Sequence, residues 1–246
     1  MDQKPLQLAS QITALLLQEI QQGKYRNAQR LPPETQLAEE LRVSRTVIRD
    51  ALSALEQDGY ISRRRGTGTL INRHVVNVAV RIDIEAEFMQ IVSKAGYTPG
   101  NHFLFSRVVH ADSRVAAQLS IQAGHDVIAA GRVITADGTP VIYCVDYIPL
   151  QLLRRTDYTE DDLKQPIFDF LQHFCGTNGS MDLTAIHARN ASETVAAVLE
   201  ITPGDAVLNF DEVWYDFDGV PILYADEYYR EGIVTHTILR KRREKT

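Results

Sequence analysis

The sequence predicts an α+β protein with an N-terminal winged helix-turn-helix domain and a larger C-terminal domain built on an antiparallel sheet. Two observations lead to this fold class. The first seventy residues hold three amphipathic helical patterns and then a short hairpin pattern, and a helix–hairpin pattern occurs twice after residue 100. We expect the domains to span residues 1–74 and 98–246, with a linker over 75–97.

Three helices are expected before residue 60. Apolar residues recur at helical spacing over 6–22, and Gly23 suits the end of that helix. A second helix is expected to begin at Pro33 and Glu34, a pair that suits a first turn. Ser44 is a good N-cap for a third helix. The inward-facing positions of that helix are Val47, Ile48, Ala51, Leu52 and Leu55.

A hairpin is expected after the third helix, which Gly59 ends. Strand-like runs over 60–63 and 69–72 flank the segment Arg65-Gly66-Thr67-Gly68. Three helices followed by such a wing are the parts that a winged helix-turn-helix uses to bind DNA.

The charge of the chain is uneven along its length and agrees with this assignment. The formal net charge is −6, but residues 1–74 contain eleven Lys or Arg and eight Asp or Glu, which gives +3. Residues 75–246 contain fifteen and twenty-four, which gives −9. Because Lys and Arg that neutralise phosphates release counterions, we expect nucleic acid to bind the N-terminal part.

The third helix presents its N-terminal side chains to a major groove in this prediction. Arginine there can form a bidentate contact to guanine or pair with phosphate, and the wing glycines allow a close approach of the backbone. The alternative is that Arg45 and Arg49 form only a solvated helix face. The expected DNA-binding residues are Arg30, Thr35, Ser44, Arg45, Thr46, Arg49, Arg65, Gly66, Thr67 and Gly68.

The stretch LPPETQLAEELRVSRTVIRDALSALEQDGYISRRRGTGTLI resembles the signature of GntR-type bacterial transcription regulators. The resemblance implies that Arg45, Thr46 and Arg49 contact operator DNA and that Gly66 lies at the wing tip. Many family members carry Arg or Lys just after the Glu of the second helix, where this chain has Thr35.

The C-terminal half is expected to contain a duplicated unit. Residues 73–83 have an extended character, and residues 84–94 have an apolar face that suits a helix. The two copies are SRVAAQLSIQAGHDVIAAGRVITADGTPVIYCVDYIP and SETVAAVLEITPGDAVLNFDEVWYDFDGVPILYADEYY. Each has a helix, a strand, an Asp-Gly hairpin turn and a returning strand. Residues 235–240 suit a last strand, and a cleft is expected between the two halves.

This half resembles the effector-binding domain of the HutC subfamily, called UTRA, whose fold is similar to chorismate lyase. The resemblance covers about residues 98–240. Its markers are the first-copy helix, Arg132 before the Asp-Gly-Thr-Pro turn, residues 146–149, Pro221-Ile222 and residues 228–230. Arg132 matches an Arg that relatives use to hold an acidic effector, and an ion pair with a nearby Asp is the alternative.

Other positions depart from the sugar-phosphate sensors of the subfamily. Those proteins often carry Arg, Glu and Ser where this chain has Ile134, Cys144 and Pro166. A phosphate group would therefore lack many of the polar contacts expected to bind it. The other candidate pocket side chains are aromatic or acidic, and the aromatic ones could stack on a ring or face a cation of the effector. This aromatic and acidic set includes Phe105 and Glu227. The predicted effector-binding residues are Arg132, Tyr143, Cys144, Phe168, Trp214, Tyr224 and Asp226.

Other chemistries are not indicated. The histidines lack ligand spacing, Cys144 and Cys175 form no redox or zinc motif, and nucleotide-binding and hydrolase motifs are missing. No apolar run reaches the roughly 20 residues that span a bilayer, and no signal peptide is recognised.

We therefore predict a cytoplasmic, homodimeric transcription regulator, most often a repressor in this family. It needs no cofactor or metal, and it binds a palindromic double-stranded operator and a small organic effector. One alternative is an enzyme with a chorismate-lyase-like domain tethered to DNA. Another is an architectural DNA binder whose second domain only dimerises.

Overall fold

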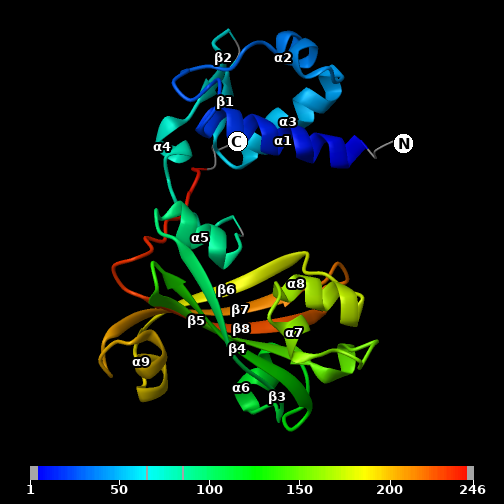
Figure 1. Ribbon diagram of the computed structural model, residues 1–246. Helices are drawn as coiled ribbons and strands as arrows, with labels where there is room; N and C mark the ends of the chain where they lie inside the picture. Colours follow the sequence, from blue (N-terminus) through cyan, green and yellow to red (C-terminus); the bar gives the residue numbers. More distant parts are fainter. Residues whose placement is uncertain (1–4, 65, 85, 243–246) are drawn as a thin grey trace. The chain divides into compact units, whose positions relative to one another are not determined.

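The computed structural model describes residues 5–64, 66–84 and 86–242, and the chain divides into two compact units. The N-terminal unit comprises Met1–Glu85 together with the C-terminal segment His236–Thr246, and the sheet unit comprises Ala86–Thr235 (Figure 1). Each unit buries its own hydrophobic clusters.

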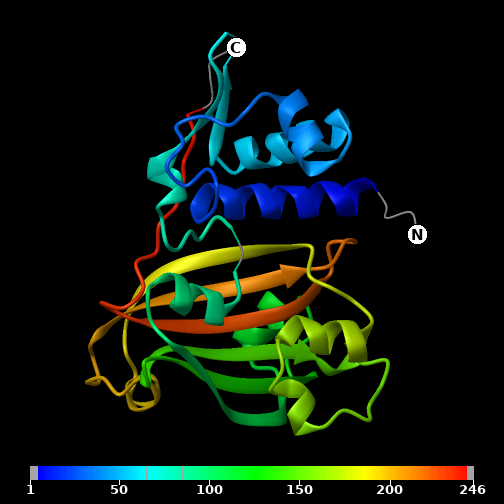
Figure 2. The ribbon, with the colours of Figure 1, turned by 45° about the horizontal axis from the view of Figure 1, so that its top comes forward.

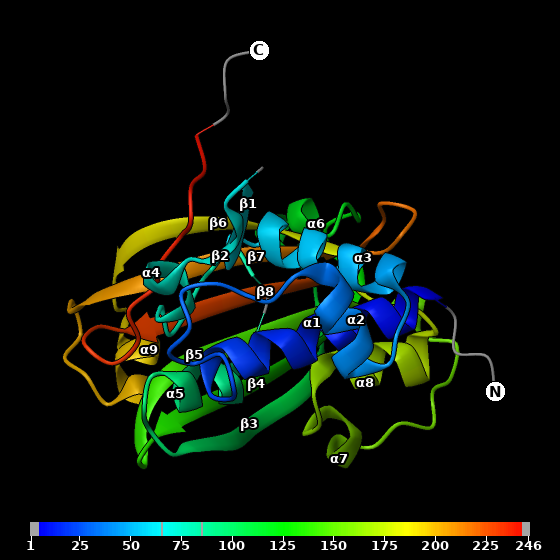
Figure 3. The same ribbon diagram turned by 90° about the horizontal axis from the view of Figure 1, so that it is seen from above.

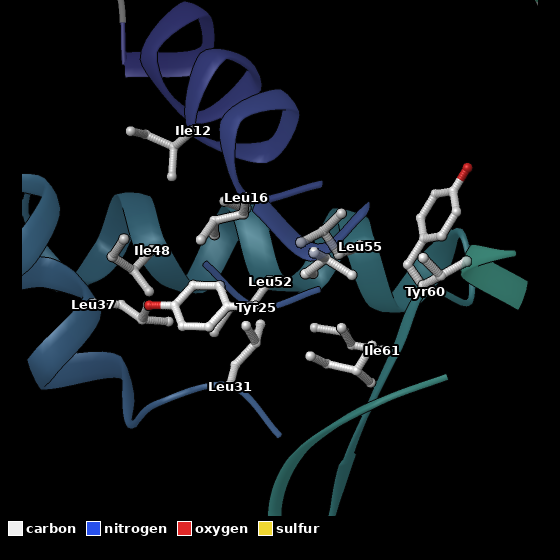
Figure 4. Packing of buried hydrophobic residues seen from close by; sticks show 14 of the residues in the cluster. Ile12, Leu16, Tyr25, Leu31, Leu37, Ile48, Leu52, Leu55, Tyr60 and Ile61 are labelled. Atoms are coloured by element: carbon white, nitrogen blue, oxygen red, sulfur yellow. The ribbon is translucent and has the colours of Figure 1, made fainter. Parts of the chain in front are cut away.

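Three helices form the body of the N-terminal unit: α1 (Pro5–Gln21), α2 (Glu34–Leu41) and α3 (Arg45–Gln57). Helices α1 and α3 pack along each other (Figure 2). Leu16 from α1 meets Ile48, Leu52 and Leu55 from α3, and Leu37 from α2 closes the cluster (Figure 4). The five inward-facing positions predicted for the third helix are all buried, which confirms its amphipathic pattern.

The predicted wing is present and has a third, short partner. Strand β1 (Ile61–Arg64) pairs antiparallel with β2 (Gly68–Ile71). The loop before α2 lies along β2, because Leu31 N donates to Thr69 O at 3.0 Å and Ile71 N donates to Gln29 O at 2.9 Å. The wing is therefore fixed to the loop that leads into the helix-turn-helix.

The segment after the wing differs from the extended linker that the sequence suggested. Residues Arg73–Val76 form a short helix, α4, and α5 (Phe88–Lys94) begins later than the helical pattern over 84–94. Residues 235–240 contribute only an isolated parallel bridge, Arg81 to Thr237, in place of the strand that we expected.

Arg73 explains why the chain turns into α4 at this point. Its Nη1 donates to Ile20 O at 2.8 Å, its Nε to Ala28 O at 3.2 Å, and its Nη2 to Tyr25 O and Ala28 O. One guanidinium thus satisfies the carbonyl groups at the end of α1 and in the loop that follows it.

We expect Arg73→Ala to destabilise the N-terminal unit by about 2–4 kcal/mol, because three partly buried carbonyl groups lose a charged donor. Thermal unfolding followed by circular dichroism measures the change. Arg26→Ala, an exposed arginine in the same loop region, is the matched control and should change stability by less than about 0.5 kcal/mol. Equal melting temperatures for the two variants would contradict the assigned role of Arg73.

The C-terminal segment packs within the N-terminal unit rather than with the sheet. Lys241 Nζ donates to Glu56 O and Gln57 O, both at 2.6 Å, at the C-terminal end of α3. Leu239 packs against the core of the unit, and Leu239 N donates to Asp83 Oδ1 at 3.2 Å. A cation at a helix C-terminus and an apolar contact explain this placement, which the charged tail alone did not reveal.

The sheet unit holds six antiparallel strands in the order β3-β4-β5-β8-β7-β6, so the predicted antiparallel sheet is confirmed (Figure 3). The strands are β3 (Pro99–His110), β4 (Asp126–Ala136), β5 (Thr139–Pro149), β6 (Met181–Asn190), β7 (Ala206–Tyr215) and β8 (Pro221–Arg230). The central pair, β5 and β8, brings together the returning strands of the two sequence copies. Strand β6 was not predicted.

Helices cover both faces of the sheet. Helices α6 (Ser113–Gln118) and α9 (Glu193–Leu199) pack on what we call the α6/α9 face. The opposite α7/α8 face carries η1 (Leu150–Leu152), α7 (Glu160–Leu163), α8 (Ile167–Phe170) and η2 (Leu171–Cys175). The copies match in their caps too, because Asp112 accepts from Val115 N and Ser192 accepts from Val195 N.

Candidate DNA-binding surface and effector site

The N-terminal end of α3 presents polar side chains to solvent. Ser44 caps the helix by accepting a hydrogen bond from Val47 N at 3.3 Å, as predicted. Arg45 and Thr46 are exposed, and Arg49 keeps 60% of its side chain exposed. Arg49 Nε lies 3.9 Å from Glu34 Oε2, a separation that lets the guanidinium turn toward a ligand.

The wing tip is supported from the loop before α2. Arg30 Nη1 donates to Thr67 O at 2.9 Å, so this arginine holds the wing as well as lying beside it. Gly66 and Gly68 have φ of +80° and +83° with open space around each α-carbon. A side chain at either position would strain the backbone and would prevent a ligand from approaching the backbone closely. Thr35 is exposed, and Arg65 lies outside the described residues.

Two neighbouring wing arginines have different surroundings. Arg63 Nε donates to Glu56 Oε2 at 2.8 Å and its Nη2 to Ser53 Oγ at 3.0 Å, which ties the wing to α3. Arg64 is exposed and lines a surface groove with Arg30 and Thr67. Arg64 is not among the DNA-binding residues expected from the sequence, although alternation along a strand places neighbouring side chains on opposite sides.

The predicted effector-binding residues divide between the two faces of the sheet. Arg132, Cys144 and Trp214 have the strand parity of the α7/α8 face, and Phe168 meets Trp214 edge-on at 4.6 Å between ring centroids. Tyr143, Tyr224 and Asp226 have the opposite parity and lie on the α6/α9 face. A strand's side chains alternate between faces, so these seven residues do not surround one ligand.

Arg132 forms the ion pair that was considered as the alternative to ligand binding. The residue is only 5% exposed, its Nη2 lies 3.0 Å from Asp146 Oδ2, and its Nη1 donates to Gln165 O at 3.4 Å. Within the described part of the chain, Nε and Nη2 have no hydrogen-bond partner of acceptable geometry. Burial raises the pKa of Asp146, and the charge of Arg132 opposes that change.

Two carboxyl groups lie on the same face: Glu227, which belongs to the aromatic and acidic set considered from the sequence, and Glu212, which the sequence analysis missed. Glu227 is 4% exposed and accepts a hydrogen bond from Tyr229 Oη at 2.6 Å. Glu212 accepts from Trp214 Nε1 and, at 3.3 Å, from Thr184 Oγ1. Burial, followed by the charge of Asp182, raises the pKa of Glu212 to about 7.

The pKa of Glu227 is also raised well above its ordinary value, by burial and then by the charge of Glu212. The two carboxyl groups therefore interact strongly. Strand parity is the signal that could have found Glu212 and placed it beside Glu227, once the pairing of β7 with β8 is known.

The acids of the opposite face are neutralised within the protein. Arg114 Nη2 lies 2.6 Å from Asp211 Oδ1 and 2.9 Å from Asp226 Oδ1. Asn209 Nδ2 donates to Asp226 Oδ1 at 2.9 Å, and Tyr224 Oη donates to Asp211 Oδ1 at 2.7 Å. This network joins α6 to strands β7 and β8, so the predicted residues Tyr224 and Asp226 have structural partners.

Over residues 5–64, 66–84 and 86–242, no group of three or more His, Cys, Asp or Glu side chains is arranged to hold a metal ion. In the same ranges no helix combines the length and apolar character needed to cross a membrane.

A winged helix unit that exposes arginines at its recognition helix, in one chain with a six-stranded sheet, defines the class of DNA-binding transcription regulators with an effector domain. Residues 8–71 match the model of the bacterial regulatory proteins of the gntR family, and residues 94–232 match the UTRA domain. The chain belongs to the GntR family and carries a UTRA domain.

Relatives and solved structures agree with this assignment. The chain is 30% identical over 207 residues to RB1450, an uncharacterized HTH-type transcriptional regulator of Rhizobium meliloti. The match covers 84% of this chain and 84% of RB1450. It is 25% identical over 228 residues to the transcriptional repressor NagR of Bacillus subtilis, covering 93% of this chain and 92% of NagR. The crystal structure of the possible transcriptional regulator YydK from Bacillus subtilis shares the fold, with a TM-score of 0.75 and 20% sequence identity. The match covers 98% of this chain and 100% of YydK.

Proposed function

We propose that the protein is a sequence-specific repressor whose operator affinity is controlled by a small molecule bound on the α7/α8 face of its sheet. The observation that carries the DNA-binding part is the exposed N-terminal end of α3, with Arg45 and Arg49 beside a wing built on two glycines. Two similar proteins are described as repressors, NagR and the probable fructoselysine utilization operon repressor of Escherichia coli.

We propose further that two copies bind a palindromic operator. One α3 helix contacts only a few base pairs, and a two-fold dimer places two such helices in successive major grooves. The edge strand β6 offers a surface for association, since Met181 and Leu183, on the same face of the strand, are 61% and 67% exposed. Light scattering of the purified protein in solution tests the dimer, and a monomeric mass at micromolar concentration would contradict it.

The connection between the two units gives ligand binding a way to affect DNA binding. The chain passes between the units twice, after Glu85 and again before His236. The second passage ends where Lys241 contacts the last turn of α3. A ligand that favours one arrangement of these connections changes operator affinity, and a coupling of roughly 1–3 kcal/mol corresponds to about 5- to 150-fold.

A thermal-shift screen of small acids, sugars and amines, followed by a DNA-release assay of the hits, tests the proposed control. Arg132→Gln should weaken binding of such a hit by about tenfold or more, because a charged hydrogen-bond donor is lost. Operator affinity without ligand should stay within about twofold of the original protein, since Arg132 lies in the other unit. An unchanged ligand response in this variant would place the ligand elsewhere.

A further inference from the structure

The duplication in the sheet unit puts different charges at equivalent positions. Arg132 lies twenty residues after the N-cap Asp112 of α6, and Glu212 lies twenty residues after the N-cap Ser192 of α9. In the returning strands, Asp146 and Glu227 each lie six residues after a proline, Pro140 and Pro221. The first copy therefore has an Arg–Asp pair where the second copy has a Glu–Glu pair.

Sheet register brings both pairs onto the α7/α8 face. Arg132 is opposite Cys144, and Cys144 is opposite Glu227, so these three side chains form one row across β4, β5 and β8. Asp146 is opposite Ala225, and Ala225 is opposite Glu212, which makes the adjacent row across β5, β8 and β7. The pairs thus lie side by side on neighbouring strands.

The two pairs differ in how their charges are compensated. Arg132 and Asp146 neutralise each other at 3.0 Å. Among the described residues no Lys, Arg or His forms an ion pair with Glu212 or Glu227. Their hydrogen bonds come from neutral donors, which hold the carboxyl oxygens in place without cancelling charge. Burial without a cation favours the protonated form of a carboxyl group, and a cation that binds beside the pair would let it ionise.

Arg132 supplies a second, independent sign of a ligand at this place. Its side chain is 93% buried, and the Nη2 atom ends beside Asp146, next to the carboxyl pair. Nη2 has Asp146 as its ion-pair partner, whereas Nε is a buried donor without a hydrogen-bond partner among the described residues. Buried donors of this kind are almost always satisfied in native proteins, so an acceptor from outside the chain is expected.

We propose that the α7/α8 face binds a small dipolar molecule, with an anionic group at Arg132 and an ammonium group at Glu212 and Glu227. The inference rests on the proposed function, because it names the ligand class of the same effector site. Arg132 and Glu227 lie on strands separated by one other strand, a spacing of roughly 10 Å between backbones. Glu212 is partly exposed and Glu227 is buried, so Glu212 is the member of the pair that solvent reaches.

The test compares ligands that differ only at the group facing the carboxyl pair. Calorimetric titration of the full-length protein uses 4-aminobutyrate, 5-aminopentanoate and 6-aminohexanoate, each with its hydroxy-acid and its unsubstituted acid. We expect at least one amino acid to bind about tenfold or more tightly than its two analogues, because charged hydrogen bonds contribute about 1.5–3 kcal/mol.

Glu212→Gln and Glu227→Gln should each remove the preference for the amine, so that the three ligands of a set bind within about twofold of one another. The exposed Glu193→Gln on α9 is the control and should keep the preference. Equal binding of the amino acid and its analogues to the original protein would overturn the inference.

Failure of every member of the series to bind would also overturn the assigned ligand class. That outcome would not contradict the proposed function, because the thermal-shift screen and the DNA-release assay do not require the ligand to be an amine. A preference that persists in both glutamine variants would show that the ammonium group binds elsewhere, and it would equally contradict the inference.

Discussion

Arg45→Ala and Arg49→Ala are each expected to weaken operator binding by about 10- to 100-fold, because a bidentate arginine contact to a base contributes about 1–3 kcal/mol. Both side chains are exposed on α3, and the buried face of the helix does not depend on them. Fluorescence anisotropy on a duplex selected from random sequence by the original protein measures the change.

Arg26→Ala provides the matched control for these variants. It removes the same charge from an exposed position in the same unit, between α1 and α2. Its effect should be limited to a uniform electrostatic loss of less than about threefold. If Arg45→Ala and Arg49→Ala behaved like Arg26→Ala, α3 would not be the recognition helix.

Glu212→Gln is expected to stabilise the sheet unit at pH 8 by on the order of 3 kcal/mol, in keeping with a pKa raised from 4.5 to about 7. The folded protein binds this proton more tightly than the unfolded chain does. Its stabilising contribution is therefore complete below pH 4.5 and is lost as the pH rises through 7. Burial, Asp182 on β6 and Asp146 on β5 all act in this direction.

Denaturant unfolding followed by the fluorescence of Trp214, the single tryptophan of the chain, reports on the sheet unit. At pH 5 the original protein and Glu212→Gln should differ little, and the difference should grow toward pH 8. The exposed Glu193→Gln should show no such growth. A pH-independent difference for Glu212→Gln would mean that this carboxyl group titrates normally.

The sequence predicts the N-terminal unit in detail because its signals are local. The cap at Ser44, the helical spacing of Val47, Ile48 and Leu52, and the Gly-rich wing each act over a few residues. The signal for a strand pair joined by an Asp-Gly turn is also local in sequence. Asp137 and Gly138 both adopt the positive φ that such a turn requires.

The effector site was harder to predict because it depends on pairing between distant strands. Glu212 and Glu227 become neighbours of Arg132 only through the β5–β8 and β7–β8 registers. The sequence alone therefore placed Tyr224 and Asp226 in one effector site with Trp214, although they lie on the opposite face of the sheet. The C-terminal segment is a similar case, since Lys241 is 184 residues from the carbonyl of Gln57 that it contacts.

The most direct test of the account is the affinity of the full-length protein for its selected operator with and without a saturating ligand from the thermal-shift screen. We predict that the ligand weakens binding by about 5- to 150-fold and that Arg132→Gln suppresses this change. The same affinity in both conditions, with the ligand demonstrably bound to the sheet unit, would contradict the claim that this unit controls the DNA-binding unit.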